Sequence, residues 1–321
     1  SALAANTTSH FNVAIGAETL DANTTGARNT AIGTFALSDV VTGGYNVALG
    51  YAALNQNTSN YNTAIGYEAL LRNVGAAQNT SVGYRALDHN TTGDNLASLG
   101  YNSLTANTTG TNNTAIGSKA LQDSTTGGSN TALGYASLFS NTTASNNVAV
   151  GASSLESTTT GYNNTAVGHF AGKAITGHSN TCIGQGAGES VTSGNENILI
   201  GHNVENNSAG AERNIVIGND IAGAGSDTVR IGLASGTATL SLDGSDTSWA
   251  AASDERLKKD IADSTVGLNF IKALRPVTFK WNAKNAIANT LPKYDASSSD
   301  PVYGTGKAHH GFIAQEVKAV I

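Results

Sequence analysis

A short block that ends in glycine recurs through most of this chain and constrains the fold more than any other feature. The block reads Asn-Thr-Ala-Ile-Gly or a close variant, and its glycines lie 17 residues apart, with two steps of 16 and a last step of 14. A fixed period of this length is typical of solenoids, in which each repeat is one turn of a stack. The glycines of the fourteen copies are Gly16, Gly33, Gly50, Gly66, Gly83, Gly100, Gly117, Gly134, Gly151, Gly168, Gly184, Gly201, Gly218 and Gly232.

The residues around each glycine predict one coil. Ile, Val or Leu precedes the glycine in every copy, and because these residues favour strands we expect this position to lie in the core. Ala or another small residue stands one position earlier, with Cys182 as one variant that we expect to be a small core residue. Leu follows four residues after the glycine in the first nine copies, from Leu20 to Leu155.

The segments between blocks have the composition of turns. Asn-Thr-Thr-Gly stands at 90–93 and again at 107–110. Gly and Asn tolerate positive φ, and Asn and Thr side chains bond to the nearby backbone, so both properties are expected to be used here. Equivalent asparagines should stack as ladders.

The repeats predict a mainly β fold, with a β-solenoid or β-roll stalk of 17-residue coils over residues 1–232. One unit is too small to bury a core, whereas stacked units can do so. With coils about 4.8 Å apart, fourteen of them make a rod on the order of 65 Å long. Leu3 lies 17 residues before Leu20, so we expect the sequence to begin inside a repeat and to be part of something longer.

The alternation of strand residues bears on oligomeric state. Neighbouring residues on a strand face opposite ways, so the aliphatic residue and the alanine before it cannot both point inward. We expect the aliphatic residue to fill the coil and the alanine face to lie against other chains, which gives a homo-oligomer, with a homotrimer preferred. A monomeric solenoid with alanine at a tight corner is the alternative.

The last copies and the segment after them predict a cap. Gly172 and Gly188 replace the leucine, and the final copy is shortened, as terminal repeats often are. Residues 233–252 are therefore predicted to be a capping or linker segment, with a short strand at 238–242.

The chain changes character near Ser253. Residues 1–252 carry a net charge of −9 and residues 253–321 one of +3, and all three prolines lie in the second part. The apolar spacing there predicts a helix over 266–275, and strands are expected over 277–281 and 311–314. His309 and His310 are expected to lie in a loop.

Two resemblances follow from these residues. The repeat over residues 1–232 resembles the heads of trimeric autotransporter adhesins, in which Asn-x-x-Ala-Ile-Gly blocks form left-handed β-rolls. Ser-Asp-Glu-Arg-Leu-Lys-Lys-Asp-Ile at 253–261, Leu-Arg-Pro, Phe-Lys-Trp at 279–281 and Gly-Phe-Ile-Ala-Gln-Glu-Val at 311–317 are similar to the self-cleaving intramolecular chaperone domain of phage tail fibres and tailspikes.

The second resemblance implies a small α+β chaperone domain over 253–321, which we expect to be truncated because the sequence ends soon after its last motif. In that family the domain trimerises the chain and cuts itself off with a Ser/Lys dyad. The resemblance makes Ser253 the nucleophile, Lys258 the base and Ser253–Asp254 the scissile bond. A lysine acts as a base only if its pKa is lowered.

The residues alone leave a simpler interpretation of this segment open. Ser253 can be a helix N-cap, with Asp254 and Glu255 at its positive end, and Lys258 a solvated charge. Ser253 and Lys258 are five residues apart, which is a rotation of about 500° along an α-helix, so their side chains would point in different directions on a regular helix. The dyad therefore needs Ser253 outside regular helix, or a Lys258 from a neighbouring chain.

These observations favour a structural and adhesive trimeric fibre, the distal part of a phage tail fibre, located in the virion and extracellular. Its expected partners are its own copies and a host-surface glycan or protein. A bacterial surface adhesin and an ice-binding repeat are alternatives. A polysaccharide-degrading tailspike is another, but it needs paired carboxylates, and the acidic residues fall at different repeat positions: Asp88, Asp94, Glu156 and Glu189.

Several function classes are not expected. The net charge of −6 argues against nucleic-acid binding, and no apolar run of about 18 residues suggests membrane insertion. No cofactor or metal is expected, and no enzymatic activity is expected in the stalk. Tyrosines follow the repeat glycine in several copies, as at Tyr51 and Tyr67, and are expected to form a stripe along the stalk. We expect this stripe to be a structural ladder; a sugar-binding site is the less favoured interpretation.

Overall fold

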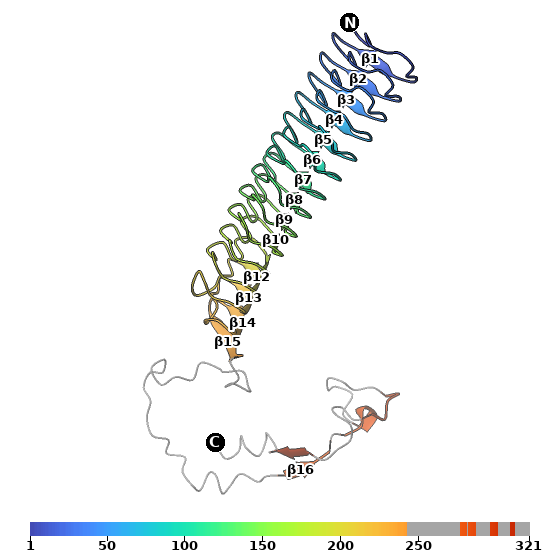
Figure 1. Ribbon diagram of the computed structural model, residues 1–321. Helices are drawn as coiled ribbons and strands as arrows, with labels where there is room; N and C mark the ends of the chain where they lie inside the picture. The colour runs from blue at the N-terminus through green and yellow to red at the C-terminus, as the bar shows by residue number, and fades with distance from the viewer. Residues whose placement is uncertain (243–276, 281, 287–295, 301–308, 312–321) are drawn as a thin grey trace. The chain divides into compact units, whose positions relative to one another are not determined.

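The computed structural model of the protein divides into a unit over Ser1–Ala252 and a unit over Ser253–Ile321. In the first unit, fourteen strands from β1 (Val13–Ile15) to β14 (Thr228–Leu233) pair in parallel in sequence order, thirteen steps in all (Figure 1). The predicted β-solenoid is therefore confirmed. The structure describes residues 1–242, 277–280, 282–286, 296–300 and 309–311.

Each repeat contributes one short strand. The strands between the first and the fourteenth are β2 (Thr30–Ile32), β3 (Val47–Leu49), β4 (Thr63–Ile65), β5 (Thr80–Val82), β6 (Ala97–Leu99), β7 (Thr114–Ile116), β8 (Thr131–Leu133), β9 (Val148–Val150), β10 (Thr165–Val167), β11 (Thr181–Ile183), β12 (Ile198–His202) and β13 (Ile215–Asn219).

The strands pair without a shift in register. Between β7 and β8, for example, Ala115 lies opposite Ala132 and Ile116 lies opposite Leu133. Turns stack in the same way, because the backbone N–H of Leu37 donates to the carbonyl of Ala53 in the next coil at 3.0 Å. Equivalent residues of successive repeats therefore form straight columns along the first unit.

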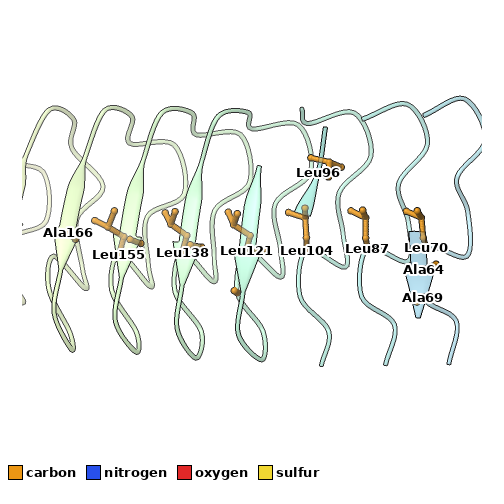
Figure 2. Close-up of a cluster of buried hydrophobic side chains, with 14 of the residues drawn as sticks. Ala64, Ala69, Leu70, Leu87, Leu96, Leu104, Leu121, Leu138, Leu155 and Ala166 are labelled. Atoms are coloured by element: carbon orange, nitrogen blue, oxygen red, sulfur yellow. The ribbon is translucent and has the colours of Figure 1, made fainter. Parts of the chain in front are cut away.

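The core of each coil is built from small residues and one leucine. The alanine in the middle of the strand is buried, as at Ala115 and Ala132, and so is the alanine before the leucine, as at Ala120. The leucine column runs through the interior (Figure 2). Its members are all 0% exposed: Leu20, Leu37, Leu54, Leu70, Leu87, Leu104, Leu121, Leu138 and Leu155.

The expected orientation of the strand was wrong. The aliphatic residue before the glycine points outward, as Leu133 does with 44% of its surface exposed, while the neighbouring Ala132 is completely buried. The leucine and the second alanine already fill the narrow interior opposite the strand, and only a small side chain such as Ala132 or Ser98 fits on the strand's inner face. A second large side chain there would overpack a closely packed core.

The repeat glycine is required by its backbone conformation and by the next coil. Gly117 has φ of 136°, in a region that residues with a Cβ rarely adopt. A Cβ there would also collide with the backbone carbonyl of Gly134. The repeat glycines therefore mark the positions where one coil approaches the next most closely.

The turns between the repeats differ from the expectation in their backbone conformation. Gly93 and Asn90 are not among the residues with positive φ, so that part of the prediction was wrong. A Cβ on Gly93 would instead collide with the carbonyl of Gly110 in the next coil. The predicted side-chain bonds are confirmed: Asn90 Nδ2 donates to the carbonyl of Gly93 at 2.8 Å, and the N–H of Gly93 donates back to Asn90 Oδ1 at 3.1 Å.

A buried asparagine ladder, which confirms the expected stacking, lies just before the strands. Asn130 is typical: its N–H donates to Asn113 Oδ1 at 2.9 Å, its Oδ1 accepts from the N–H of Asn147 at 3.0 Å, and its Nδ2 donates to the carbonyl of Ala144 at 2.8 Å. Each side chain thus satisfies backbone groups of its own and the next coil. At the same position in another coil stands Leu96, which is 2% exposed.

An Asn130→Leu variant is expected to lose stability without a steric conflict, since Leu96 shows that this position accepts leucine. The N–H of Asn147 loses its partner, and the carbonyl of Ala144 keeps only the longer bond from Asn141 Nδ2 at 3.3 Å. A buried group left unpaired costs about 1–3 kcal/mol. Thermal and denaturant unfolding of this variant should show a clear loss beside wild type. Thr126→Ala, on an exposed turn of the same coil, is the control, and equal stability of both variants would contradict the role of the ladder.

The core changes composition toward the C-terminal end of the solenoid. Gly172 and Gly188 stand where the leucine was, and Ile175, Val191 and Leu199 are buried instead. A Cβ on Gly188 would press on the side chains of Cys182 and Leu199. The apolar volume of the missing leucine is therefore supplied by other residues of the coil, such as Ile175 beside Gly172 and Leu199 in β12 beside Gly188.

An antiparallel strand ends the sheet. β15 (Gly236–Ser241) pairs with β14 and confirms the strand expected near 238–242. Arg230 takes the core position in β14, where its Nη1 donates to the carbonyl of Ala222 at 2.8 Å and its Nη2 to Thr237 Oγ1 at 3.0 Å. An arginine that bonds to the backbone closes the apolar column with a polar group.

The described part of the second unit holds an antiparallel pair of strands, β16 (Val277–Phe279) and β17 (His309–Gly311), and a 3-10 helix, η2 (Lys284–Ala286). The strand expected from Val277 is confirmed as far as Phe279. His309 and His310 lie in β17, so their assignment to a loop was wrong: their backbone pairs with Phe279 and Thr278. The helix expected over 266–275 and residues 312–314 lie outside the described residues.

Candidate functional site

The outward face of the sheet runs along the whole solenoid and is open to solvent. The aliphatic residues before the glycines form one column along this face. None of the fourteen is buried, and ten of them expose between 36% and 58% of their surface. Those ten are Ile15, Leu49, Ile65, Leu99, Ile116, Leu133, Val167, Ile183, Ile217 and Ile231.

A second column on the same face starts each strand two residues earlier. It consists of threonine in seven coils and of Val, Ile or Ala in the others, so neither column contains a charged residue. Parallel sheets in proteins are normally covered on both faces, and monomers rarely expose a continuous apolar patch of this extent. We call these two columns the outer sheet face.

A tyrosine ladder lies beside the outer sheet face, immediately after the repeat glycine. The rings of Tyr51, Tyr67, Tyr84 and Tyr101 stack on one another, with centroids 5.1, 5.3 and 5.3 Å apart. The stripe expected from the sequence is therefore a structural ladder. Glu68 lies beside the hydroxyl of Tyr67 and raises the pKa of that phenol.

The acidic residues weighed as hydrolytic groups have different structural partners. Asp88 is buried and accepts from Arg85 Nη2 at 2.7 Å, an interaction that raises the pKa of Arg85. Asp94 Oδ1 accepts the backbone N–H of Ala77 at 2.7 Å. The first contact stabilises one turn and the second links neighbouring coils, and neither gives its carboxylate the arrangement of a general acid or base.

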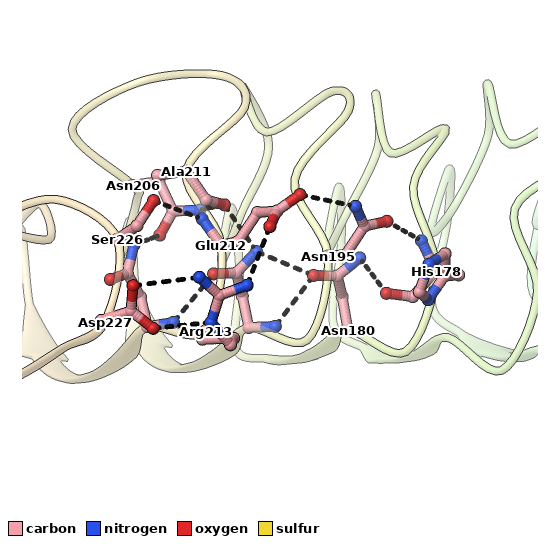
Figure 3. A network of polar contacts seen from close by, with 11 residues as sticks. His178, Asn180, Asn195, Asn206, Ala211, Glu212, Arg213, Ser226 and Asp227 are labelled. Carbon is pink, nitrogen blue, oxygen red and sulfur yellow. Dashed lines mark hydrogen bonds and ion pairs between the residues drawn. The ribbon is translucent and has the colours of Figure 1, made fainter. Parts of the chain in front are cut away.

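Polar side chains also link the turns of the last coils (Figure 3). The N–H of His178 donates to Asn195 Oδ1 at 2.9 Å, and Asn195 Nδ2 donates to Glu212 Oε1 at 2.9 Å. Arg213 and Asp227 form a paired contact, with Nε to Oδ1 at 2.6 Å and Nη2 to Oδ2 at 3.0 Å. The Arg213–Asp227 pair is solvent-exposed, so its energetic contribution is modest. The group keeps the turns aligned where the repeat length changes.

Cys182 is confirmed as a core residue. Its side chain is completely buried in β11, and burial raises the pKa of the thiol to about 12. The protonated thiol is a poor nucleophile and a poor metal ligand. In the described part of the chain, no group of three or more His, Cys, Asp or Glu residues is placed to hold a metal ion.

The proposed dyad belongs to a different part of the chain. Ser253, Asp254 and Lys258 lie outside the described residues, so their assignment as nucleophile, scissile bond and base stays a prediction. What the sequence missed is the outer sheet face, because the alternation of strand residues identifies two faces and does not say which one is inside.

Comparison with known proteins supports the interpretation of the C-terminal region. Residues 253–321 match the family described as the chaperone of endosialidase. No curated protein matches the chain, and no solved structure does. The chaperone resemblance found in the motifs is thus confirmed for those residues.

A chaperone sequence of this family that follows a β-solenoid fits a protein of the phage tail-fibre type. The family implies assembly as a trimer and an extracellular, tail-associated setting. Among the described residues, no helix has the length and apolar character needed to cross a membrane.

Proposed function

We propose that the chain is a homotrimeric adhesive fibre, the distal part of a phage tail fibre, assembled by its C-terminal chaperone. Residues 1–232 form the stalk, residues 233–252 the capping and linker segment, and residues 253–321 the chaperone domain. The observation that carries the proposal is the outer sheet face. Its aliphatic column needs a cover that the chain's described residues do not supply, and two further copies of the chain supply it.

The energetics favour this assembly. Full burial of a Val, Leu or Ile side chain contributes about 1.5–3 kcal/mol, and the ten exposed members of the column retain roughly 36–58% of their surface for burial between chains. Neither column contains a charge, so no charged group has to be desolvated when the faces meet. The trimeric number follows from the chaperone family.

The direct test is the native mass of the purified chain. We expect three copies of the 32.5 kDa chain, or three shortened copies if residues 254–321 are removed, at low micromolar concentration. Native mass spectrometry together with sedimentation velocity measures both states. A stable monomer would contradict the proposal.

The chaperone is proposed to release itself once the trimer has formed. Lys258 accepts the proton of the Ser253 hydroxyl, whose oxygen attacks the carbonyl carbon of the Ser253–Asp254 bond. Attack by that hydroxyl on its own carbonyl would close a strained four-membered ring, so we place the nucleophile on a neighbouring chain. The proton passes to the nitrogen of Asp254 as the C–N bond breaks, and water then hydrolyses the ester.

The proposed external partner is a glycan or protein of the host surface. The solenoid presents few charges and many hydroxyl, amide and tyrosine side chains along its length, and such groups suit a neutral polar ligand. A bacterial surface adhesin would use the same fibre in another setting. The genes beside this one distinguish the two, since tail genes accompany a tail fibre.

A further inference from the structure

The tyrosine ladder contains one vacant position. After the repeat glycine come tyrosines in four successive coils, ending at Tyr101, then Ser118, then Tyr135. Within the ladder, neighbouring rings lie nearly parallel, with interplanar angles of 12°, 9° and 11°. Ser118 therefore stands where the next ring of the ladder would be.

The backbone continues through the vacancy without a change of register. The N–H of Lys119 donates to the carbonyl of Tyr101 at 2.9 Å, and the N–H of Ala136 donates to the carbonyl of Ser118 at 3.0 Å. Tyr101 and Tyr135 are thus two coil steps apart, which is about 9.6 Å at the usual strand spacing. Between them lies a slot that is one ring wide, with Ser118 as its floor.

The exposure of the tyrosines agrees with an open slot. Tyr51, Tyr67 and Tyr84 expose 43%, 43% and 44% of their surface, whereas Tyr101 exposes 51% and Tyr135 exposes 55%. The increase occurs at the two residues that border Ser118. Tyr135 also has Ala152, which carries no ring, in the coil after it, so the comparison rests on Tyr101, whose other neighbour is Tyr84. The additional exposure of Tyr101 agrees with a ring face that is open toward Ser118.

The slot has the width that one ring of the ladder occupies. Neighbouring rings in the ladder stack with centroids 5.1–5.3 Å apart, so two rings that are two coil steps apart leave room for one six-membered ring between them. A pyranose ring is of this size, and its C–H bonds on both faces can contact the two aromatic walls.

The polar surroundings suit a ring with hydroxyl substituents. Ser118 contributes a hydroxyl to the floor. Lys119 occupies the position next to it, as Glu68 does beside Tyr67, and its ammonium group forms no ion pair with any residue that the structure describes. Donors at the edge of two aromatic walls give the combination of apolar contact and a few polar groups found in ligand sites.

We propose that the slot between Tyr101 and Tyr135, above Ser118, binds a pyranose ring of a glycan. The inference rests on the proposed function, for which it names the class of ligand and the place where it binds. The two aromatic faces contact the C–H groups on the two faces of the sugar, and Lys119 and Ser118 bind its oxygen substituents.

Saturation-transfer difference NMR with methyl glucopyranoside and methyl glucuronide as probes tests the site on the full chain. We expect saturation of ring protons on both faces of the sugar with wild type. Ser118→Tyr completes the ladder and should abolish the signal, and Tyr135→Ala removes one wall and should weaken binding about tenfold. Ala17→Tyr, which adds a tyrosine at the equivalent position of the first coil, should bind like wild type.

The outcomes distinguish failure of the proposed sugar site from failure of the proposed trimeric fibre. No transfer to either sugar with wild type, or equal transfer with Ser118→Tyr and wild type, would overturn the slot. Native mass of the same samples reports the assembly independently. A trimer that fails to bind either sugar refutes only the slot, whereas a monomer refutes the proposed function.

Discussion

A chain carrying both Ile116→Glu and Leu133→Glu is expected to remain folded and to lose its trimeric state. Both residues lie on the outer sheet face, exposing 37% and 44% of their surface, so glutamate can be accommodated in the isolated coil. In the trimer six carboxylates would be buried without cations, at a cost on the order of 3–5 kcal/mol for each unpaired charge. That cost exceeds what the remaining aliphatic contacts contribute locally.

Native mass spectrometry and circular dichroism together measure this result. The variant should run as a monomer with the β signal of wild type. Thr126→Glu, which adds one glutamate on an exposed turn between these two strands, should remain a trimer. A double glutamate variant that keeps the mass of three chains after residues 254–321 have been removed would show that the outer sheet face is not the interface.

Ser253→Ala is expected to abolish removal of residues 254–321 completely. Without the hydroxyl there is no nucleophile, so the intact mass of the expressed chain should be that of the full sequence, while wild type should lose the C-terminal piece. Lys258→Arg should block cleavage as well, because a guanidinium stays protonated and cannot accept the hydroxyl proton. Lys259→Arg, next in the chain, is the matched control and should cleave normally.

Intact-mass measurement of these four samples decides the matter. A full-length mass for wild type shows that this chain does not cut itself. Cleavage of Lys258→Arg at the normal rate would remove Lys258 from the proposed dyad while leaving Ser253 in place. Since the nucleophile is placed on a neighbouring chain, wild-type chains held as monomers should also stay intact.

The sequence predicted the architecture of the stalk because its information is periodic. Glycines such as Gly117 and Gly134 recur where coils approach most closely, and asparagines recur where a side chain must satisfy two backbones, as Asn130 does. Such requirements apply to each coil separately, so they can be identified without knowing the path of the chain. The C-terminal chaperone was identified in the same way, from motifs that are continuous in sequence.

Which face of the strand lies inside was decided only by the tertiary structure. Ile116 and Ala115 alternate with equal regularity, and hydrophobicity alone favours burying the isoleucine. The coil is nevertheless narrow, and Leu121 and Ala120 approach from the opposite wall, so there is room only for a small side chain such as that of Ala115. That volume depends on how the rest of the turn folds back, and the exposed aliphatic face that would hold the fibre together is its consequence.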